Sequence, residues 1–196
     1  VGGTCSFEAY VRYDDNGNWA RVFDFGDGQA DNIFLSRYET SSAIGFVIRT
    51  GTSGLTGDIN NGTITNSQFT HVVATVTSAN VMKLYQDGVL LQTLSSGVTA
   101  PTVMTRAYHY LGRSNWNNDA MLKGYMKYFR VWQGHELTQD EVSHLYSHRD
   151  SAPLPSYAWD FRVDSSTGPV DSIGGLTSTY ENGLTSSMTM GAYFAG

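Results

Sequence analysis

The chain has 196 residues, of which 13 % are aromatic and only 15 % are charged, and its net charge is −6. This length predicts one domain with at most a small appendage, and 21 glycines beside so many aromatic residues are typical of a β-protein with many turns. An acidic chain without a cluster of Lys and Arg is a poor partner for nucleic acid or for an anionic membrane surface. No apolar run is long enough to predict insertion into a bilayer.

The chain contains one cysteine and one N-glycosylation sequon. Cys5 has no partner for a disulfide within the chain, and it begins a strand pattern, so it is expected to be a small buried hydrophobe. Asn61 opens the sequon Asn61-Gly62-Thr63 and is the candidate glycosylation site. The sequence begins at Val1 without a signal peptide, which indicates a processed chain or a segment of a longer one.

The first predicted strand, Cys5–Tyr13, alternates between two faces. Every second residue from Cys5 onward is apolar or aromatic, while Glu8 and Arg12 belong to the opposite face. The pattern predicts a strand with one buried face. A cluster of turn residues over 14–18 follows it.

The stretch Arg21–Arg37 predicts two strands joined by a polar loop over 26–31, and the rest of the chain is organised around this hairpin. Four of its residues crowd oxygen atoms onto the loop and its flanks, where a hard cation such as calcium would find ligands. They are Asp24, Asp27, Asp31 and Asn32. The alternative is that Asp24 pairs with a core arginine while the other residues cap turns.

Six further strands are predicted downstream, and the glycine-rich stretch 50–62 predicts a loop. The pair Asp87-Gly88 between two β-runs predicts a tight hairpin. The predicted strands are Ile44–Arg49, Phe69–Thr77, Val81–Gln86, Val89–Leu94, Tyr108–Gly112 and Leu122–Trp132.

One short helix is predicted near the C-terminal third, over Thr138–Ser147. Thr138 is its expected cap, Glu141 lies three residues further on, and Val142 and Leu145 form an apolar stripe. Many short strands with turn signals, together with one helix, predict an all-β fold built as a two-sheet antiparallel sandwich.

Several spaced motifs resemble the laminin-G-like, concanavalin A-like lectin and glucanase superfamily of jelly-roll domains. Besides the hairpin above they are SFEAYVRYD at 6–14, FTHVVATV at 69–76, MKLYQDGVLL at 82–91, YLGRSNW at 110–116 and LKGYMKYFRVWQGHELTQDEV at 122–142. The resemblance spans Cys5–Tyr146 and implies two curved antiparallel sheets in a jelly roll. It also implies a noncatalytic extracellular or cell-surface module that binds glycans or proteins, sometimes through calcium.

The C-terminal part resembles the opening of a domain of this family, although it follows the predicted helix. We expect a jelly-roll sandwich over 1–150, a Pro-containing linker over 151–156, and early strands of the same fold over 157–196. These strands complete either their own sandwich, as a circular permutation, or a neighbouring copy of the domain. The residues expected on the completing strands are Tyr157, Trp159, Phe161, Val170, Ile173, Met188, Met190 and Phe194.

Enzyme chemistry finds little support in the sequence. Glycoside hydrolases of this architecture need two carboxylates about 5–10 Å apart, and no strand carries the acid-x-acid-x-x-acid pattern that would place them. His144 and His148 are spaced i, i+4 at the end of the predicted helix, without the HExxH context of a metalloprotease. We therefore expect a protein that is not an enzyme, and a glycoside hydrolase relative is the weakest alternative.

A lectin site needs an aromatic platform beside polar groups. Trp116 is the best candidate platform because it lies in a polar loop with Arg113, Asn115 and Asp119. Its alternative role is to cover the core. Trp19 is a second candidate.

The function expected first is a structural or adhesive module, a repeat unit of a head-to-tail filament or tandem array. Its partners would be other copies of the same domain, linked by strand complementation. The alternative is a calcium-assisted lectin domain whose partners are glycans. Both functions predict an extracellular or cell-surface location, and neither predicts a nucleic-acid partner or membrane insertion.

Overall fold

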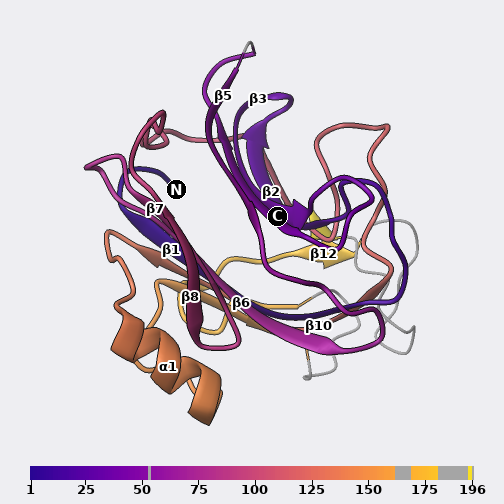
Figure 1. Cartoon of the computed structure of the whole chain (residues 1–196), viewed down its shortest axis with the longest axis vertical. Helices are drawn as coiled ribbons and strands as arrows, with labels where there is room; N and C mark the ends of the chain where they lie inside the picture. The colour runs from indigo at the N-terminus through magenta and orange to yellow at the C-terminus, as the bar shows by residue number, and fades with distance from the viewer. Residues whose placement is uncertain (53, 162–168, 181–193, 196) are drawn as a thin grey trace.

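Two antiparallel sheets lie face to face in the computed structural model, which describes residues 1–52, 54–161, 169–180 and 194–195 (Figure 1). The six-stranded sheet has the order β11 (Tyr157–Asp160), β10 (Gly124–Gln133), β1 (Cys5–Tyr13), β6 (Phe69–Val76), β7 (Met82–Gln86) and β8 (Val89–Leu94). The seven-stranded sheet has the order β12 (Thr179–Tyr180), β13 (Phe194–Ala195), β9 (Tyr108–Leu111), β2 (Arg21–Asp27), β3 (Ala30–Arg37), β4 (Ile44–Arg49) and β5 (Leu55–Asn61). Helix α1 (Gln139–His148) lies outside the six-stranded sheet.

This architecture confirms the predicted two-sheet jelly-roll sandwich with one short helix. The alternation of β1 has the expected effect, because its apolar residues from Cys5 to Tyr13 are buried between the sheets. Phe7 of β1 stacks on Phe23 of β2, with ring centroids 4.5 Å apart, so aromatic contacts join the two sheets at the centre of the core. The described part of the chain contains no helix with the length and hydropathy of a membrane span.

The helix also forms as predicted, one residue later at each end. Thr138 is the N-cap, and its side chain and that of Glu141 form a reciprocal capping box. Val142 and Leu145 turn inward onto Trp132 of β10, in a second apolar cluster on the outer side of the six-stranded sheet. Asp87 and Gly88 have positive φ angles of 51° and 84°, which suits the predicted tight hairpin between β7 and β8.

Two sequence-based expectations on strands are wrong. The stretch expected to be a loop over 50–62 contains β5, because Ile59 is an inward-facing core residue and Gly57 lies where any Cβ would clash with Met82. The loop expected over 26–31 is a two-residue turn at Gly28 and Gln29, since β2 and β3 extend to Asp27 and Ala30.

The expectation of a single buried face on β1 is also wrong. Ser6 and Glu8, on the other face, are completely buried beneath α1 and the segments that flank it. Glu8 accepts hydrogen bonds from Arg130 Nη1 at 2.9 Å and pairs with His71 Nε2 at 2.8 Å. Arg130 in turn donates to the backbone carbonyls of Arg149 and Asp150. This buried cluster therefore ties three strands to the chain that leaves the helix.

Beyond that segment, β11 pairs with β10 of the same chain. Trp159 enters the core, and Tyr157 and Phe161 pack against its edge, as their alternation predicts. Val170 and Ile173 are instead exposed. Phe194 belongs to the short strand β13, whereas Met188 and Met190 lie outside the described residues.

Removing the Glu8 side chain is expected to destabilise the domain strongly, because Arg130 would stay buried without the carboxylate that pairs with its charge. For Glu8→Ala we expect a loss of about 3–5 kcal/mol in the free energy of unfolding, measured by urea denaturation. The matched control is Asp14→Ala, which breaks the partly exposed pair with Arg12 and should change the unfolding midpoint little. Equal effects of the two variants would contradict a structural role for the Glu8 cluster.

Candidate functional site

The outer face of the seven-stranded sheet carries a row of polar and aromatic side chains. Register places Tyr110 of β9, Asp24 of β2 and Phe34 of β3 side by side across the strands. The alternation of β2 turns Phe23 and Phe25 into the core, which puts Asp24 on the opposite side. This row lies under the loop that follows β9.

Asp24 is the buried centre of that face, with no exposed surface. Its Oδ1 accepts from Asn32 Nδ2 at 2.7 Å, and its Oδ2 accepts from the backbone N–H of Asn115 at 3.0 Å. Ser114 Oγ and Arg21 Nε lie 3.5 Å from the same Oδ2. A single carboxylate therefore joins β2 to β3 and to the loop after β9.

Arg21 supplies the positive charge beside Asp24. Its Nη2 donates to Asp119 Oδ2 at 2.8 Å, and its guanidinium lies over the ring of Phe34, 3.9 Å from the centroid. Burial raises the pKa of Asp119, while the nearby charge of Arg21 and the hydroxyl of Ser114 oppose that rise. The ion pair thus holds the far end of the loop against the sheet.

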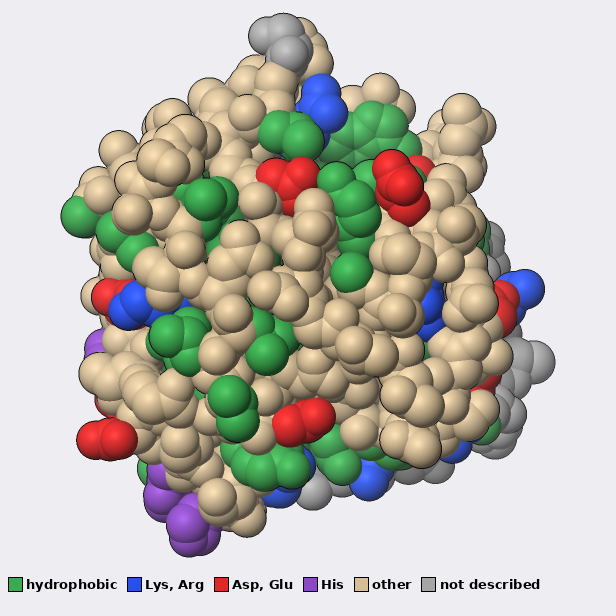
Figure 2. Space-filling model, in the orientation of Figure 1, with side chains coloured by type: hydrophobic (Ala, Val, Ile, Leu, Met, Phe, Trp, Pro, Cys, Tyr) green, Lys and Arg blue, Asp and Glu red, His purple; other side chains and the backbone are tan. Residues whose placement is uncertain are grey.

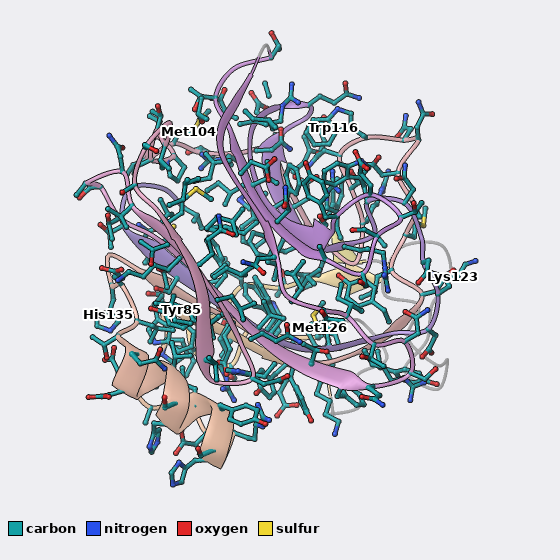
Figure 3. All side chains as sticks on the ribbon, viewed as in Figure 1. Tyr85, Met104, Trp116, Lys123, Met126 and His135 are labelled. Carbon is teal, nitrogen blue, oxygen red and sulfur yellow. The ribbon has the colours of Figure 1, made fainter. Side chains whose placement is uncertain are left out.

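Trp116 lies half-buried above this pair, at the opposite end of the molecule from His135 and α1 (Figure 3). Its ring meets Phe34 edge-on at 6.0 Å, and the guanidinium of Arg49 lies 5.3 Å from its centroid. Trp19 also meets Phe34 edge-on, with ring centroids 6.3 Å apart. Both tryptophans therefore act in part as covers over the sheet.

A shallow hollow of about 240 Å³ opens beside this cover, and we call it the β9 hollow. Tyr108 and Tyr110 stack with ring centroids 6.1 Å apart and planes 29° apart, and Tyr108 is 46 % exposed. The guanidinium of Arg113 lies 4.6 Å from the centroid of Tyr110. The lining consists of Gly28, Gln29, Tyr108, Tyr110, Arg113, Ser114, Asn115 and Asn117.

The residues proposed from sequence for glycan binding divide between the hollow and its support. Arg113 and Asn115 line the β9 hollow, whereas Trp116 and Asp119 pack behind the loop that forms its wall. Sequence reasoning missed the two tyrosines. The run YHYL does carry the signal, because residues two apart on a strand share a face and both are aromatic.

The family model of the concanavalin A-like lectin/glucanases superfamily matches residues 2–143. The chain belongs to this superfamily. No curated protein sequence matches it.

Solved structures share the superfamily fold at low sequence identity. Domain 4 of AbnA, an extracellular arabinanase from Geobacillus stearothermophilus solved with arabinotriose, is 17 % identical with a TM-score of 0.61, covering 74 % of this chain and 67 % of that one. The CBM40 domain of a Ruminococcus gnavus sialidase bound to α2,3 sialyllactose is 14 % identical with a TM-score of 0.57, covering 74 % and 84 %. The binding domain of botulinum neurotoxin serotype G is 15 % identical with a TM-score of 0.53, covering 76 % and 37 %.

Most of the oxygens of the residues proposed for calcium have partners within the chain or face solvent. Both oxygens of Asp24 accept from protein N–H donors, Asp31 Oδ1 accepts from the backbone of Gly51 at 2.9 Å, and Asp27 is exposed at the turn. Asn32 Oδ1 is buried without a hydrogen-bond partner among the described residues, but it is a single oxygen. In the described part of the chain no three His, Cys, Asp or Glu side chains converge on a metal position. Calcium binding by this loop stays a prediction.

Two other sequence candidates lie on the surface. His144 and His148 stack 4.2 Å apart on α1, where Figure 2 shows the histidines gathered at one corner of the molecule. His144 pairs with Asp150, and His148 Nδ1 lies 3.1 Å from the carbonyl oxygen of His144. Asn61 is exposed at the end of β5, and its glycosylation stays a prediction.

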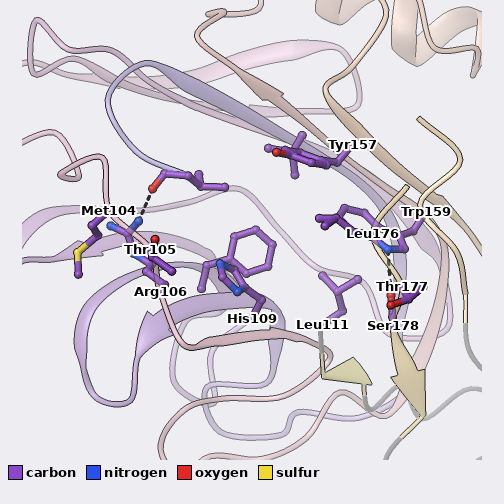
Figure 4. Close-up of a pocket in the computed structure, with 13 residues that line it drawn as sticks. Met104, Thr105, Arg106, His109, Leu111, Tyr157, Trp159, Leu176, Thr177 and Ser178 are labelled. Atoms are coloured by element: carbon purple, nitrogen blue, oxygen red, sulfur yellow. Dashed lines mark hydrogen bonds between the residues drawn. The ribbon is translucent and has the colours of Figure 1, made fainter. Parts of the chain in front are cut away.

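A second cavity, of about 350 Å³, lies between the sheets at the end where the N-terminus meets β9 and β11 (Figure 4). Trp159 lines it and donates from Nε1 to Ser178 Oγ at 3.0 Å. His109 points into it from β9 and meets the ring of Phe25 at 4.9 Å. Burial, with help from the N-terminal and Arg106 charges, lowers the pKa of His109 to about 4.

His109 should make the domain sensitive to acid. Its pKa is lower in the folded chain than the ordinary value of 6.5, so the unfolded chain binds the proton more tightly. The neutral ring is compatible with folding above pH 6.5, and we expect stability to fall as the pH drops from 6.5 toward 4. In the variant His109→Gln, the free energy of unfolding should fall less over this pH range than it does in the unchanged chain. Each protein is compared with its own free energy of unfolding at pH 7.5. An unchanged slope would contradict the role of His109.

Proposed function

We propose that this domain binds saccharides in the β9 hollow and acts as a noncatalytic module. The observation that carries the proposal is the pair of stacked tyrosines flanked by amide and guanidinium groups. Sugar rings have apolar C–H faces and a rim of hydroxyl groups. The tyrosine rings suit the faces, and the side chains of Gln29, Asn115 and Asn117 suit the hydroxyls.

The architecture of the hollow also favours binding over turnover. Hydrolysis of a glycosidic bond needs two carboxylates that flank it, about 5–10 Å apart. Among the described residues that line the β9 hollow there is no Asp or Glu. The neighbouring Asp24 and Asp119 are directed onto Arg21 and the loop backbone, where they hold the wall.

The comparisons support the same class of ligand. Two of the similar structures contain saccharides, arabinotriose in the arabinanase domain and sialyllactose in the sialidase domain. The arabinanase is described as extracellular, and we propose an extracellular or cell-surface location for this domain as well. The sequence indicated glycan binding as the alternative to a structural or adhesive role. With this support, glycan binding becomes the function that we propose first.

Replacement of the tyrosines is expected to weaken saccharide binding. Tyr108→Ala and Tyr110→Ala should each raise Kd by about tenfold, because each removes one aromatic contact with the sugar face. A glycan array followed by calorimetric titration of the best ligand measures the change. The matched control is Tyr146→Ala, a partly exposed tyrosine of α1 on the outer side of the other sheet. Unchanged binding by both hollow variants, with the fold intact by circular dichroism, would contradict the proposal.

A head-to-tail array of copies linked by strand exchange is the second candidate. It is motivated by the position of β11 after the helix, in a segment that resembles the opening of a domain. Contacts along the preceding segment favour pairing within one chain, since Trp132 Nε1 donates to the carbonyl of Pro153 at 2.9 Å and Ser156 N donates to Val131 at 2.8 Å.

On these contacts we expect the full chain to sediment as a monomer over a wide range of concentration. A strand held by its own linker has a high effective concentration for its own sheet and outcompetes a neighbour. Sedimentation velocity measures the outcome, with a chain truncated after Ser151 as the comparison. Species that grow with concentration, and that disappear on truncation, would instead support the array.

A further inference from the structure

The cavity between the sheets, where β9 meets β11, is the larger of the two hollows described above, and saccharide binding does not use it. We call it the β11 cavity. Its volume of about 350 Å³ lies in the range of cavities that hold small organic ligands. An unfilled apolar cavity lowers the stability of a fold, so the folded chain gains from a molecule that fills it. The apolar residues of its described walls come from both sheets and are Phe25, Leu111, Val131, Tyr157 and Trp159.

Aromatic rings of β11 form one wall of this cavity. Tyr157 and Trp159 stack with ring centroids 6.2 Å apart and planes 24° apart. The indole N–H of Trp159 already donates to Ser178 Oγ at 3.0 Å. Trp159 therefore contributes apolar ring surface to the cavity, and a flat apolar molecule suits a wall of this kind.

His109 adds a hydrogen-bonding group to these apolar surroundings. Its ring points into the cavity from β9 (Figure 4), and its nitrogens have no hydrogen-bond partner among the described residues. Burial lowers the pKa of His109 to about 4, so at neutral pH the ring is uncharged and offers one N–H donor and one acceptor. A polar group left unpaired in apolar surroundings is costly, which favours a ligand with one polar group placed at His109.

The charges around the cavity favour an uncharged ligand. The described residues that line it include no Asp or Glu, and Arg106 is a buried cation among them. Arg106 Nε donates to the carbonyl oxygen of Asp31 at 2.7 Å, and its Nη1 and Nη2 donate to the carbonyl oxygens of Val1 and Thr102. The guanidinium repels a cation, while its donors are already engaged by the backbone and offer little to an anion.

We propose that the β11 cavity binds a small, uncharged aromatic molecule that carries one hydroxyl or carbonyl group. The aromatic ring packs against Tyr157 and Trp159, and the polar group forms a hydrogen bond with His109. This site is separate from the β9 hollow, because side chains alternate along β9. His109 faces the space between the sheets, whereas Tyr108 and Tyr110 face the hollow on the outer side.

The experiment uses 2-naphthol as the probe, with naphthalene as the analogue that lacks the hydroxyl group. Calorimetric titration of the full chain at pH 7.5 measures Kd, and thermal unfolding with and without the probe measures Tm. We expect 2-naphthol to bind at one site and to raise Tm, because it binds the folded chain. In His109→Leu the Kd for 2-naphthol should rise about tenfold, while the Kd for naphthalene should not rise.

A second variant blocks the cavity without changing His109. Leu176 lines the cavity and is 50 % exposed, so Leu176→Trp adds bulk there without overpacking the core, and it should weaken the binding of both probes at least tenfold. The matched control is Leu55→Trp, since Leu55 is 52 % exposed and lies outside the cavity. Failure of 2-naphthol to bind, or binding that neither His109→Leu nor Leu176→Trp weakens, would overturn this inference. So would an equal loss of both probes in His109→Leu. Saccharide binding is tested separately by the variants of Tyr108 and Tyr110, so either proposal can fail alone.

Discussion

The candidate site depends on the burial of the Asp24 carboxylate. Removing an ionised carboxylate from water costs several kcal/mol unless partners replace the lost solvation. Asp24 finds those partners in the amide of Asn32, the backbone N–H of Asn115 and the hydroxyl of Ser114, with Arg21 close by. Loss of any one of these groups would leave part of the buried carboxylate without a hydrogen-bond partner. The loop after β9 is therefore held by a residue of a central strand, and the wall of the β9 hollow is part of the folded structure.

A buried and paired carboxylate also lies on the outer face of the six-stranded sheet, where it holds different segments in place. Glu8 lies on the outer face of the six-stranded sheet and is paired with His71 and Arg130, as Asp24 is with Arg21 on the seven-stranded sheet. Around Glu8 the helix and the segment after it cover the surface. Around Asp24 the loop after β9 leaves Tyr108 exposed and Tyr110 half-buried at its side. The difference between the covered face and the face with the β9 hollow thus follows from what each buried carboxylate holds in place.

Local patterns in the sequence predicted most of the fold. The alternation of Cys5–Tyr13, the pair Asp87-Gly88 and the capping box at Thr138 each depend on neighbours within a few residues. Each forms the expected element, although Ser6 and Glu8 on the other face of β1 are buried as well. β5 could not be recognised in the same way. Its glycine and polar residues are typical of a loop, and only the pairing with β4 and the packing of Ile59 make it a strand.

The β9 hollow could be predicted only in part, because it joins segments that are about eighty residues apart. The turn at Gly28 and Gln29 meets Arg113 and Asn115 through the pairing of β2 with β9, in which Gly26 lies opposite Tyr108. Asp24 shows the same limit. Its carboxylate oxygens suggested a cation from sequence, but the donors that satisfy them include a backbone amide far along the chain.

Gly26 of β2 allows the side chain of Asn32 to come close to the backbone of β2. A Cβ at this position would clash with the side-chain amide of Asn32, so a larger residue would push Asn32 away from Asp24. The glycine that was interpreted as loop chemistry therefore permits a close approach between two strands. That approach brings Asn32 Nδ2 to Asp24 Oδ1, and it frees Oδ2 of the same carboxylate to accept from Asn115. The absence of one side chain on β2 thus determines where the wall of the hollow stands.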